Sequence, residues 1–242
     1  METHTVLSQL SHSKRLKSVC VKLLIKGSTV VGTTRKTYQL ILGDEQGSII
    51  QATFTKDLDD SFEIPMQEGG WYELQNFEVA YAFGVTRVTR NRHQINLSDS
   101  SIIFKIPPLS FCHYYRFQTF ENIQRGLAHP KFSIDLYGAM VAVGDIEEAE
   151  IGNHSLHFSL VNMEYEHIIC VAYGEVALFL DNYWNSTNAP VVLCVLQFWE
   201  IVWGVGGLQH IKTMDGFSRI LFEPDDVPEI QTFRMRIPYY AY

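Results

Sequence analysis

The amino-acid sequence predicts an all-β protein in which one small barrel occurs twice in tandem. The first observation is an internal repeat, in which three pairs of segments match: 41–54 with 160–173, 74–81 with 196–203, and 102–104 with 220–222. Their offsets are 119, 122 and 118 residues, and two copies are too few for a solenoid. The second is that short apolar runs alternate with turn residues. The third is the length of 242 residues, which suits two domains that each bury a core.

The first copy carries five strand-like runs bounded by polar or glycine-containing stretches. These runs are residues 19–25, 37–42, 49–54, 71–79 and a part of 85–97. We expect a long polar loop over 26–36 and a tight turn at Asp44–Gly47. Residues 57–62 favour a short helical turn between the third and fourth strands.

The second copy repeats this order with a clearer helix. Its strand-like runs are residues 136–143, 156–160, 168–173, 191–203 and a run that starts at 208. Residues 174–184 place their apolar side chains on one broad face, as expected of a helix that closes the bottom of a barrel. Five strands with a helix between the third and the fourth are typical of the OB fold, a five-stranded Greek-key barrel.

The natural linker is the short stretch between the two copies. Lys105–Leu109 contains Pro107 and Pro108, which disfavour a regular element. We therefore expect a first OB domain over 1–106, a linker over 107–113 and a second OB domain over 114–242.

The composition indicates a globular chain with an uneven charge. Hydrophobic residues make up 46% and charged residues 19% of the sequence. The net charge is −8, of which residues 1–106 contribute +1 and residues 107–242 contribute −9. A polyanionic partner should therefore be held mainly by the first copy. No apolar run approaches the length of a membrane span, and the polar, basic N-terminus does not match a secretory signal, so we expect an intracellular protein without a membrane partner.

Catalytic and metal-binding patterns are missing from the sequence. The four cysteines, Cys20, Cys112, Cys170 and Cys194, are scattered and lack the close spacing of zinc ligands, which favours buried apolar roles. There is no P-loop, no Ser-His-Asp order and no metal-ligand cluster. We expect no enzymatic activity, no cofactor and no small-molecule substrate.

Three stretches carry a family resemblance: Gly43–Phe54, Tyr72–Val79 and Ser218–Glu229. They resemble the tandem DNA-binding OB domains of the replication protein A large subunit, particularly the plant branch of replication-protein-A-like OB proteins. The resemblance implies largely sequence-independent binding of single-stranded DNA in DNA replication, repair or recombination. It also implies a nuclear location, and it makes other replication-protein-A-like subunits or OB proteins candidate partners.

In that family, two aromatic residues per domain stack on bases. In the second domain the matching positions are Tyr173, which stands before Gly174-Glu175, and Trp203, which stands before a glycine-rich turn. In the first domain Phe54 occupies the third-strand position. The alternative for each aromatic is a place in the barrel core, because strands favour aromatic residues and half of them point inward.

The second stacking residue of the first domain has three candidates. The internal repeat favours Tyr81, proximity to the turn favours Phe83, and a direct match to the family favours Thr86. We assign Trp71, Phe77, Trp184 and Trp199 to the core.

Basic residues provide candidate contacts to a phosphate backbone. We place Lys22 and Lys26 on the first strand, Arg35 and Lys36 in the first long loop, Arg87, Arg90 and Arg92 on the last strand of the first domain, and Lys212 on the last strand of the second. Such charges either follow the nucleic acid or merely solvate the rim of the barrel. The rival function is a protein-interaction module, in which the same grooves bind a peptide or another OB domain.

Overall fold

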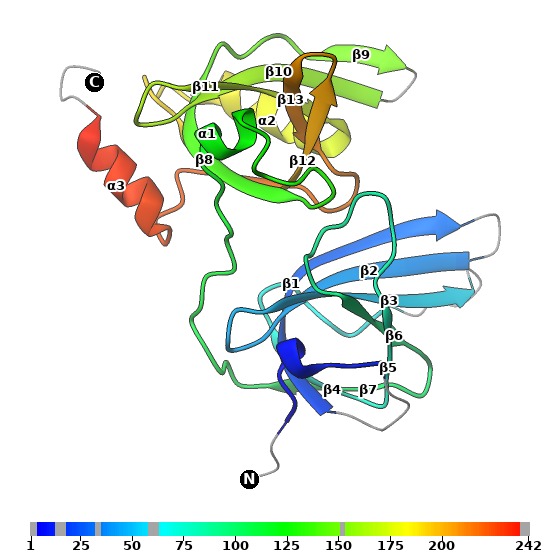
Figure 1. Cartoon of the computed structure of the whole chain (residues 1–242). Coiled ribbons are helices and arrows are strands. Elements are labelled where there is room, and N and C mark those ends of the chain that lie inside the picture. The colour runs from blue at the N-terminus through cyan, green and yellow to red at the C-terminus, as the bar shows by residue number, and fades with distance from the viewer. Residues whose placement is uncertain (1–3, 13–17, 32–34, 58–62, 151–152, 238–242) are drawn as a thin grey trace. The chain divides into compact units, whose positions relative to one another are not determined.

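The structure is a computed structural model that describes residues 4–12, 18–31, 35–57, 63–150 and 153–237. The chain divides into two compact units, Met1–Tyr114 and Tyr115–Tyr242, each a curled β barrel (Figure 1). The predicted fold class, an all-β chain of two tandem OB barrels, is confirmed. Residues 107–113 lie outside the helices and strands.

The described part of the first unit is built from strands and one short 3-10 helix. Its elements are η1 (Leu7–Gln9), β1 (Ser18–Val31), β2 (Arg35–Gly43), β3 (Ile49–Asp57), β4 (Trp71–Gln75), β5 (Glu78–Tyr81), β6 (His93–Leu97) and β7 (Ile102–Ile106). The strand order is β5-β6-β3-β2-β1-β4-β7, and β3 pairs with β6 in parallel. The predicted helical turn falls on residues 58–62, which lie outside the described residues.

The predicted fourth strand of the first unit is broken into β4 and β5. The break comes at Asn76, whose φ of 56° lies in the left-handed region. As a result, β4 pairs with β1 while β5 pairs with β6, so the two halves close the barrel on both sides. The second unit has the same feature at Phe198, with a φ of 58°, at the predicted offset of 122 residues from Asn76.

The second unit contains a closed ring of five strands. Its elements are α1 (Phe120–Gln124), β8 (Ile134–Val141), β9 (Glu147–Glu150), β10 (Asn153–Val161), β11 (His167–Tyr173), α2 (Gly174–Ser186), β12 (Leu193–Gly204), β13 (Gly207–Thr213), β14 (Arg219–Phe222) and α3 (Pro228–Arg236). The ring runs β8-β10-β11-β13-β12 and returns to β8. The predicted helix is α2, which lies between β11 and β12 and buries Ala177 and Leu180.

Each barrel buries its own apolar core. In the second unit Trp199 is fully buried and meets Phe158 edge to face, with ring centroids 5.9 Å apart. Trp71 and Phe77 are buried in the first unit, as predicted. Trp184 is half-buried against the core of the second unit. Each fully buried apolar side chain stabilises its barrel by about 1.5–3 kcal/mol.

Two expected elements of the first unit are corrected by the structure. The polar stretch 26–36 is largely a hairpin, because β1 continues to Val31 and β2 begins at Arg35, so Arg35 and Lys36 lie on a strand. The last strand begins only at His93, and residues 82–92 form a loop between β5 and β6. Arg87, Arg90 and Arg92 therefore lie on this loop and not on a strand.

The outer face of β8 and β12 in the second unit is covered by α3. Val227, Ile230 and Phe233 pack there against Leu193 and Val195. In the first unit, the chain that follows β7 returns to its own barrel instead. Tyr114 packs its ring on Gly43, and its hydroxyl donates a hydrogen bond of 2.9 Å to the backbone oxygen of Asp44. Among the described residues, no helix has the length and apolar character needed to cross a membrane.

Candidate functional site

The turn before β3 recurs before β11 in every hydrogen bond. The Asp44 carboxylate accepts backbone N–H bonds from the residues two and four positions later, at 3.1 and 2.8 Å. The Asn162 side-chain oxygen accepts the equivalent bonds at 3.0 and 2.9 Å. The offset between the two turns is thus 118 residues, one fewer than the sequence match predicts for this segment. Strand pairing agrees, since Leu42 pairs with Ile50 where Leu160 pairs with Ile168.

This single residue decides which side chains of the third strand face solvent. With the offset of 118, Phe54 corresponds to Ala172, and both are buried. Tyr173 corresponds to Thr55, and both are exposed. The expected place of Phe54 on the outer face is therefore wrong: its ring is 4% exposed and lies in the core, 6.3 Å from the ring of Tyr38. A slip of one residue moves a strand's side chains to the opposite face of the sheet.

The outer face of β2, β3 and β6 in the first unit is polar and uncharged. We call it the polar ladder; its members are Thr37, Gln39, Gln51, Thr53, Thr55 and Asn96. The side chains bond across the strands: Gln51 Nε2 donates to Gln39 Oε1 at 3.1 Å, and Thr53 Oγ1 donates to Asn96 Oδ1 at 3.1 Å. The hydroxyls of Thr37 and Thr55 are 3.0 Å apart. Sequence reasoning missed this surface, although alternation along residues 51–55 marks it.

Two aromatic side chains stand exposed at one end of this barrel. Tyr81, at the end of β5, is 67% exposed, and its ring centroid lies 5.4 Å from that of His93. Phe83 follows in the loop 82–92 and is 79% exposed. Thr86, the third candidate for this position, is half-buried in the same loop. Both rings are therefore open to stacking.

The same loop carries three arginines, and we call residues 81–92 the aromatic-basic loop. Arg90 and Arg92 are exposed. Arg87 is half-buried and donates a hydrogen bond to the backbone oxygen of Asn91. Desolvation lowers the pKa of the Arg87 guanidinium, although an arginine stays charged at neutral pH. The loop thus combines exposed rings with positive charge.

The lysines and the arginine predicted on β1 and β2 have specific partners. Lys26 Nζ donates to the backbone oxygen of Ile64 at 3.2 Å, so it holds the segment before β4 in place. Lys26 and Lys36 both lie over the Tyr38 ring, at 6.0 and 4.7 Å from its centroid. Arg35 forms an ion pair of 3.6 Å with Asp57, and because both side chains are exposed, this pair contributes little to stability.

Lys22 is placed apart from the other predicted cations. Its ammonium group lies 5.9 Å from the centroid of the Tyr114 ring, on the side of the barrel where Tyr114 covers Gly43. The structure therefore brings together Tyr81, Phe83 and the arginines on one loop. It does not bring Lys22 to that group through any contact among the described residues.

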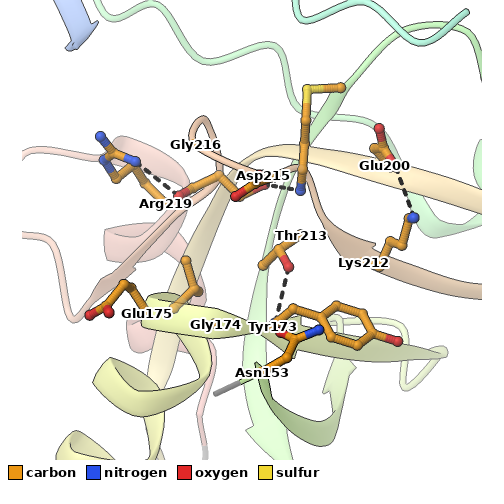
Figure 2. Close-up of a pocket in the computed structure, with 13 residues that line it drawn as sticks. Asn153, Tyr173, Gly174, Glu175, Glu200, Lys212, Thr213, Asp215, Gly216 and Arg219 are labelled. Carbon is orange, nitrogen blue, oxygen red and sulfur yellow. Dashed lines mark hydrogen bonds and ion pairs between the residues drawn. The ribbon is translucent and has the colours of Figure 1, made fainter. Parts of the chain in front are cut away.

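In the second unit, two of the predicted residues line one cavity of about 760 Å³ (Figure 2). They are Tyr173, which is 37% exposed, and Lys212. The backbone N–H of Tyr173 donates to Thr213 Oγ1 at 3.0 Å, which ties the end of β11 to the end of β13. Lys212 Nζ lies 3.3 Å from Glu200 Oε2 across the neighbouring strand, as Figure 2 shows.

The cavity also holds acidic side chains that sequence reasoning did not single out. Glu175, Glu200 and Asp215 line it, against the two cationic side chains of Lys212 and Arg219. Glu175 comes from the start of α2, and Asp215 from the loop after β13. The signal was available for Glu200 alone, because it stands directly opposite Lys212 once the two strands are paired.

Trp203 does not line this cavity. It is half-buried and packs against the core of the second unit. Its indole lies over Gly126, where an added methyl group would come within 3.6 Å of the ring. Trp203 therefore offers only a part of its surface to a ligand.

The remaining reactive groups show no assembled site. Cys20, Cys170 and Cys194 are buried and Cys112 is exposed. Burial raises the pKa of the Cys20 thiol to about 11, so this thiol stays protonated. Within the described ranges, no cluster of three or more His, Cys, Asp or Glu residues could hold a metal ion.

Comparison with known proteins gives a family match for the first half of the chain. A family model described as "Domain of unknown function DUF223" matches residues 8–126. No curated protein matches the sequence.

Solved structures match the fold over nearly the whole chain. A replication protein A heterotrimer bound to ssDNA aligns with a TM-score of 0.65 and 17% identity, over 94% of this chain and 53% of that chain. The present chain thus spans about half the length of that one. At this identity, the likeness shows the fold.

Two further OB proteins align less closely. Fission yeast Pot1 with ssDNA aligns at a TM-score of 0.35 and 13% identity, over 96% of this chain and 92% of that chain. The single-stranded DNA binding protein of Thermus aquaticus aligns at 0.29 and 11%, over 88% and 93%. These two scores are too low to support an argument.

Proposed function

We propose that this chain binds single-stranded DNA, largely without regard to sequence, and that it serves DNA replication, repair or recombination in the nucleus. Its partners besides DNA would be other replication-protein-A-like subunits or OB proteins. We assign it no catalytic role and no cofactor. The proposal is supported by the tandem OB barrels, by the family resemblance of the sequence, and by the similar replication protein A structure, which is described as bound to ssDNA.

One observation carries the proposal: the aromatic-basic loop of the first barrel. Tyr81 and Phe83 expose 67% and 79% of their surface, which is costly in water unless a partner covers them. Arg90 and Arg92 lie exposed a few residues away on the same loop. Rings that stack on bases, placed beside cations that attract phosphates, are what sequence-independent binding of a single strand needs.

The expected energetics follow from these contacts. Each base stacked on an aromatic ring contributes about 1–3 kcal/mol, and every base offers a ring face. Each phosphate contact makes binding depend on salt, because counterions are released from the strand. The first unit should dominate, since residues 1–106 carry a charge of +1 while residues 107–242 carry −9.

The rival function is a protein-interaction module, and one surface favours it. On the edge strand β7, Ile102 and Phe104 are 44% and 52% exposed. An edge strand with apolar side chains can pair with a strand or pack against a helix of another protein. This surface belongs to β4 and β7, and not to the loop 81–92.

The deciding experiment is a titration of the full chain with a fluorescent oligothymidylate long enough for both units, followed by anisotropy at low and at near-physiological salt. We expect binding that weakens steeply with salt and falls by about 10- to 100-fold or more in the variant Tyr81→Ala/Phe83→Ala. The matched control is Phe104→Ala, which removes an exposed ring from the other side of the same unit. No binding at low salt would overturn the proposal, and so would equal losses in the double variant and the control.

A further inference from the structure

The cavity of the second unit has a ring platform next to carboxylates. Gly174, with a φ of +59°, turns the chain directly from β11 into α2, so that Tyr173 and Glu175 line the same space (Figure 2). Asp215 enters from the loop after β13. A volume of about 760 Å³ exceeds what one nucleobase needs, so a base can lie against the tyrosine while its edge reaches the carboxylates.

The charges of the cavity disfavour a phosphate near these carboxylates. Among the described residues, Glu175 and Asp215 have no ion-pair partner, whereas Glu200 shares a contact of 3.3 Å with Lys212. A phosphate placed beside Glu175 and Asp215 would meet two unscreened negative charges. A hydrogen-bond donor placed there would meet two acceptors.

We infer that this cavity seats one nucleobase of the bound strand and prefers bases that carry an exocyclic amino group over thymine. The inference rests on the proposed function and names the ligand chemistry of its second site. Tyr173 supplies the stacking face, Glu175 and Asp215 accept hydrogen bonds from the amino group, and Lys212 stays on the side of the sugar-phosphate chain.

The preference follows from the edges of the bases. Cytosine, adenine and guanine each offer an amino group with two N–H donors, and acidic side chains accept from the amino group of cytosine in known complexes. Thymine offers one ring N–H between two carbonyl oxygens, which a carboxylate would repel. The polar ladder of the first unit has no such bias, because its amides both donate and accept and its hydroxyls do the same.

The test uses the full chain and two unstructured pyrimidine strands of equal length, oligodeoxycytidylate and oligothymidylate, at slightly alkaline pH where cytosine strands stay unpaired. Anisotropy gives the ratio of the two dissociation constants. We expect the cytosine strand to bind about 5- to 10-fold more tightly, as one carboxylate–amino contact would provide. The preference should be lost in Glu175→Gln/Asp215→Asn, and also in Tyr173→Ala.

The control variant is Glu164→Gln, which removes a negative charge from an exposed turn of the same unit. Removing a charge at any of these sites should tighten both strands alike through weaker repulsion, but only the cavity variants should change the ratio. Equal affinity for both strands in the unmodified chain would overturn this inference and leave the proposed function intact. A cytosine preference that survives the double variant would also overturn it. Failure to bind either strand would overturn the proposed function itself.

Discussion

The two barrels share a strand order and an inward face, but their outward faces differ. On the third strand, Ile50 and Ala52 of the first unit correspond to Ile168 and Cys170 of the second, and all four are buried apolar residues. On the outward side of the same strands, Thr55 of the first unit corresponds to Tyr173 of the second.

The outward difference extends to the neighbouring strand. The pairing β3 with β6 places Asn96 beside Thr53, whereas the pairing β11 with β13 places Lys212 beside Val171. One barrel thus presents uncharged amides and hydroxyls and the other a ring with mixed charges. Packing constrains what points inward, because a core tolerates little change in volume, while the outward face is free to take on a new ligand chemistry.

The largest expected effect tests whether the units are independent. Trp199→Ala removes the fully buried indole of the second core, which should cost about 3–5 kcal/mol. We expect the second unit to unfold at a lower temperature, while the first unit keeps its own transition and its oligothymidylate affinity. Circular dichroism during heating, with anisotropy at room temperature, checks both. The mirror variant is Tyr72→Ala in the first core, and loss of both units together in either variant would contradict the comparison.

The second prediction concerns how each unit holds its left-handed residue in the fourth strand. Asp135 in β8 accepts backbone N–H bonds from Arg116 at 2.7 Å and from Phe198 at 2.8 Å. The first unit has Ser18 at this position, and Asn76 there bonds to the backbone oxygen of Ser100 at 2.7 Å. Asp135→Asn presents an amide N–H₂ to one of the two N–H donors, which should cost the second unit about 1–3 kcal/mol at neutral pH.

The same carboxyl makes the stability of the second unit depend on pH. Burial raises the pKa of Asp135 from 3.8 to about 6, against the opposing effect of its two backbone hydrogen bonds. The folded unit therefore binds the proton more tightly than the unfolded chain. This contribution to stability is complete below about pH 4 and is lost as the pH rises through about 6. Denaturant unfolding across this range should show the decline in the unmodified chain and not in Asp135→Asn.

The third prediction transfers the ring of one barrel to the other. Thr55→Tyr places an exposed ring in the first unit at the position of Tyr173 in the second. We expect oligothymidylate affinity to rise by about 1 kcal/mol, near the lower end of what a base stack contributes. Thr55→Val, which keeps the size of the side chain, should leave the affinity unchanged. Weaker binding by Thr55→Tyr would show that the polar ladder does not face the strand.

The smallest expected effect is on salt dependence. Arg92→Gln removes an exposed cation of the aromatic-basic loop and should reduce the slope of log affinity against log salt by about 0.7. Lys212→Gln should reduce it by less, because Glu200 at 3.3 Å already offsets that charge. Titrations at several salt concentrations compare the two slopes, and a larger change for Lys212→Gln would reverse the ranking of the two units.

Part of the candidate site could be predicted from the sequence. Tyr81, Phe83 and Tyr173 are exposed as expected, and their neighbours along the chain marked them. Phe54 was misplaced because an aromatic residue fits either face of a strand, and a repeat matched with an error of one residue changes the face. Lys26 was misplaced because its carbonyl partner, Ile64, lies far away in the sequence.

By itself the sequence determined that the chain is built from strands, that the barrel occurs twice, and that α2 stands between β11 and β12. These properties depend on local periodicity and on turn residues, which neighbouring positions display. Only the tertiary structure decided that the arginines of the first unit lie on a loop, that Phe54 points inward, and that Glu175 and Asp215 join Tyr173 at one cavity. Those properties depend on strand register and on contacts between distant segments, and periodicity carries no information about either.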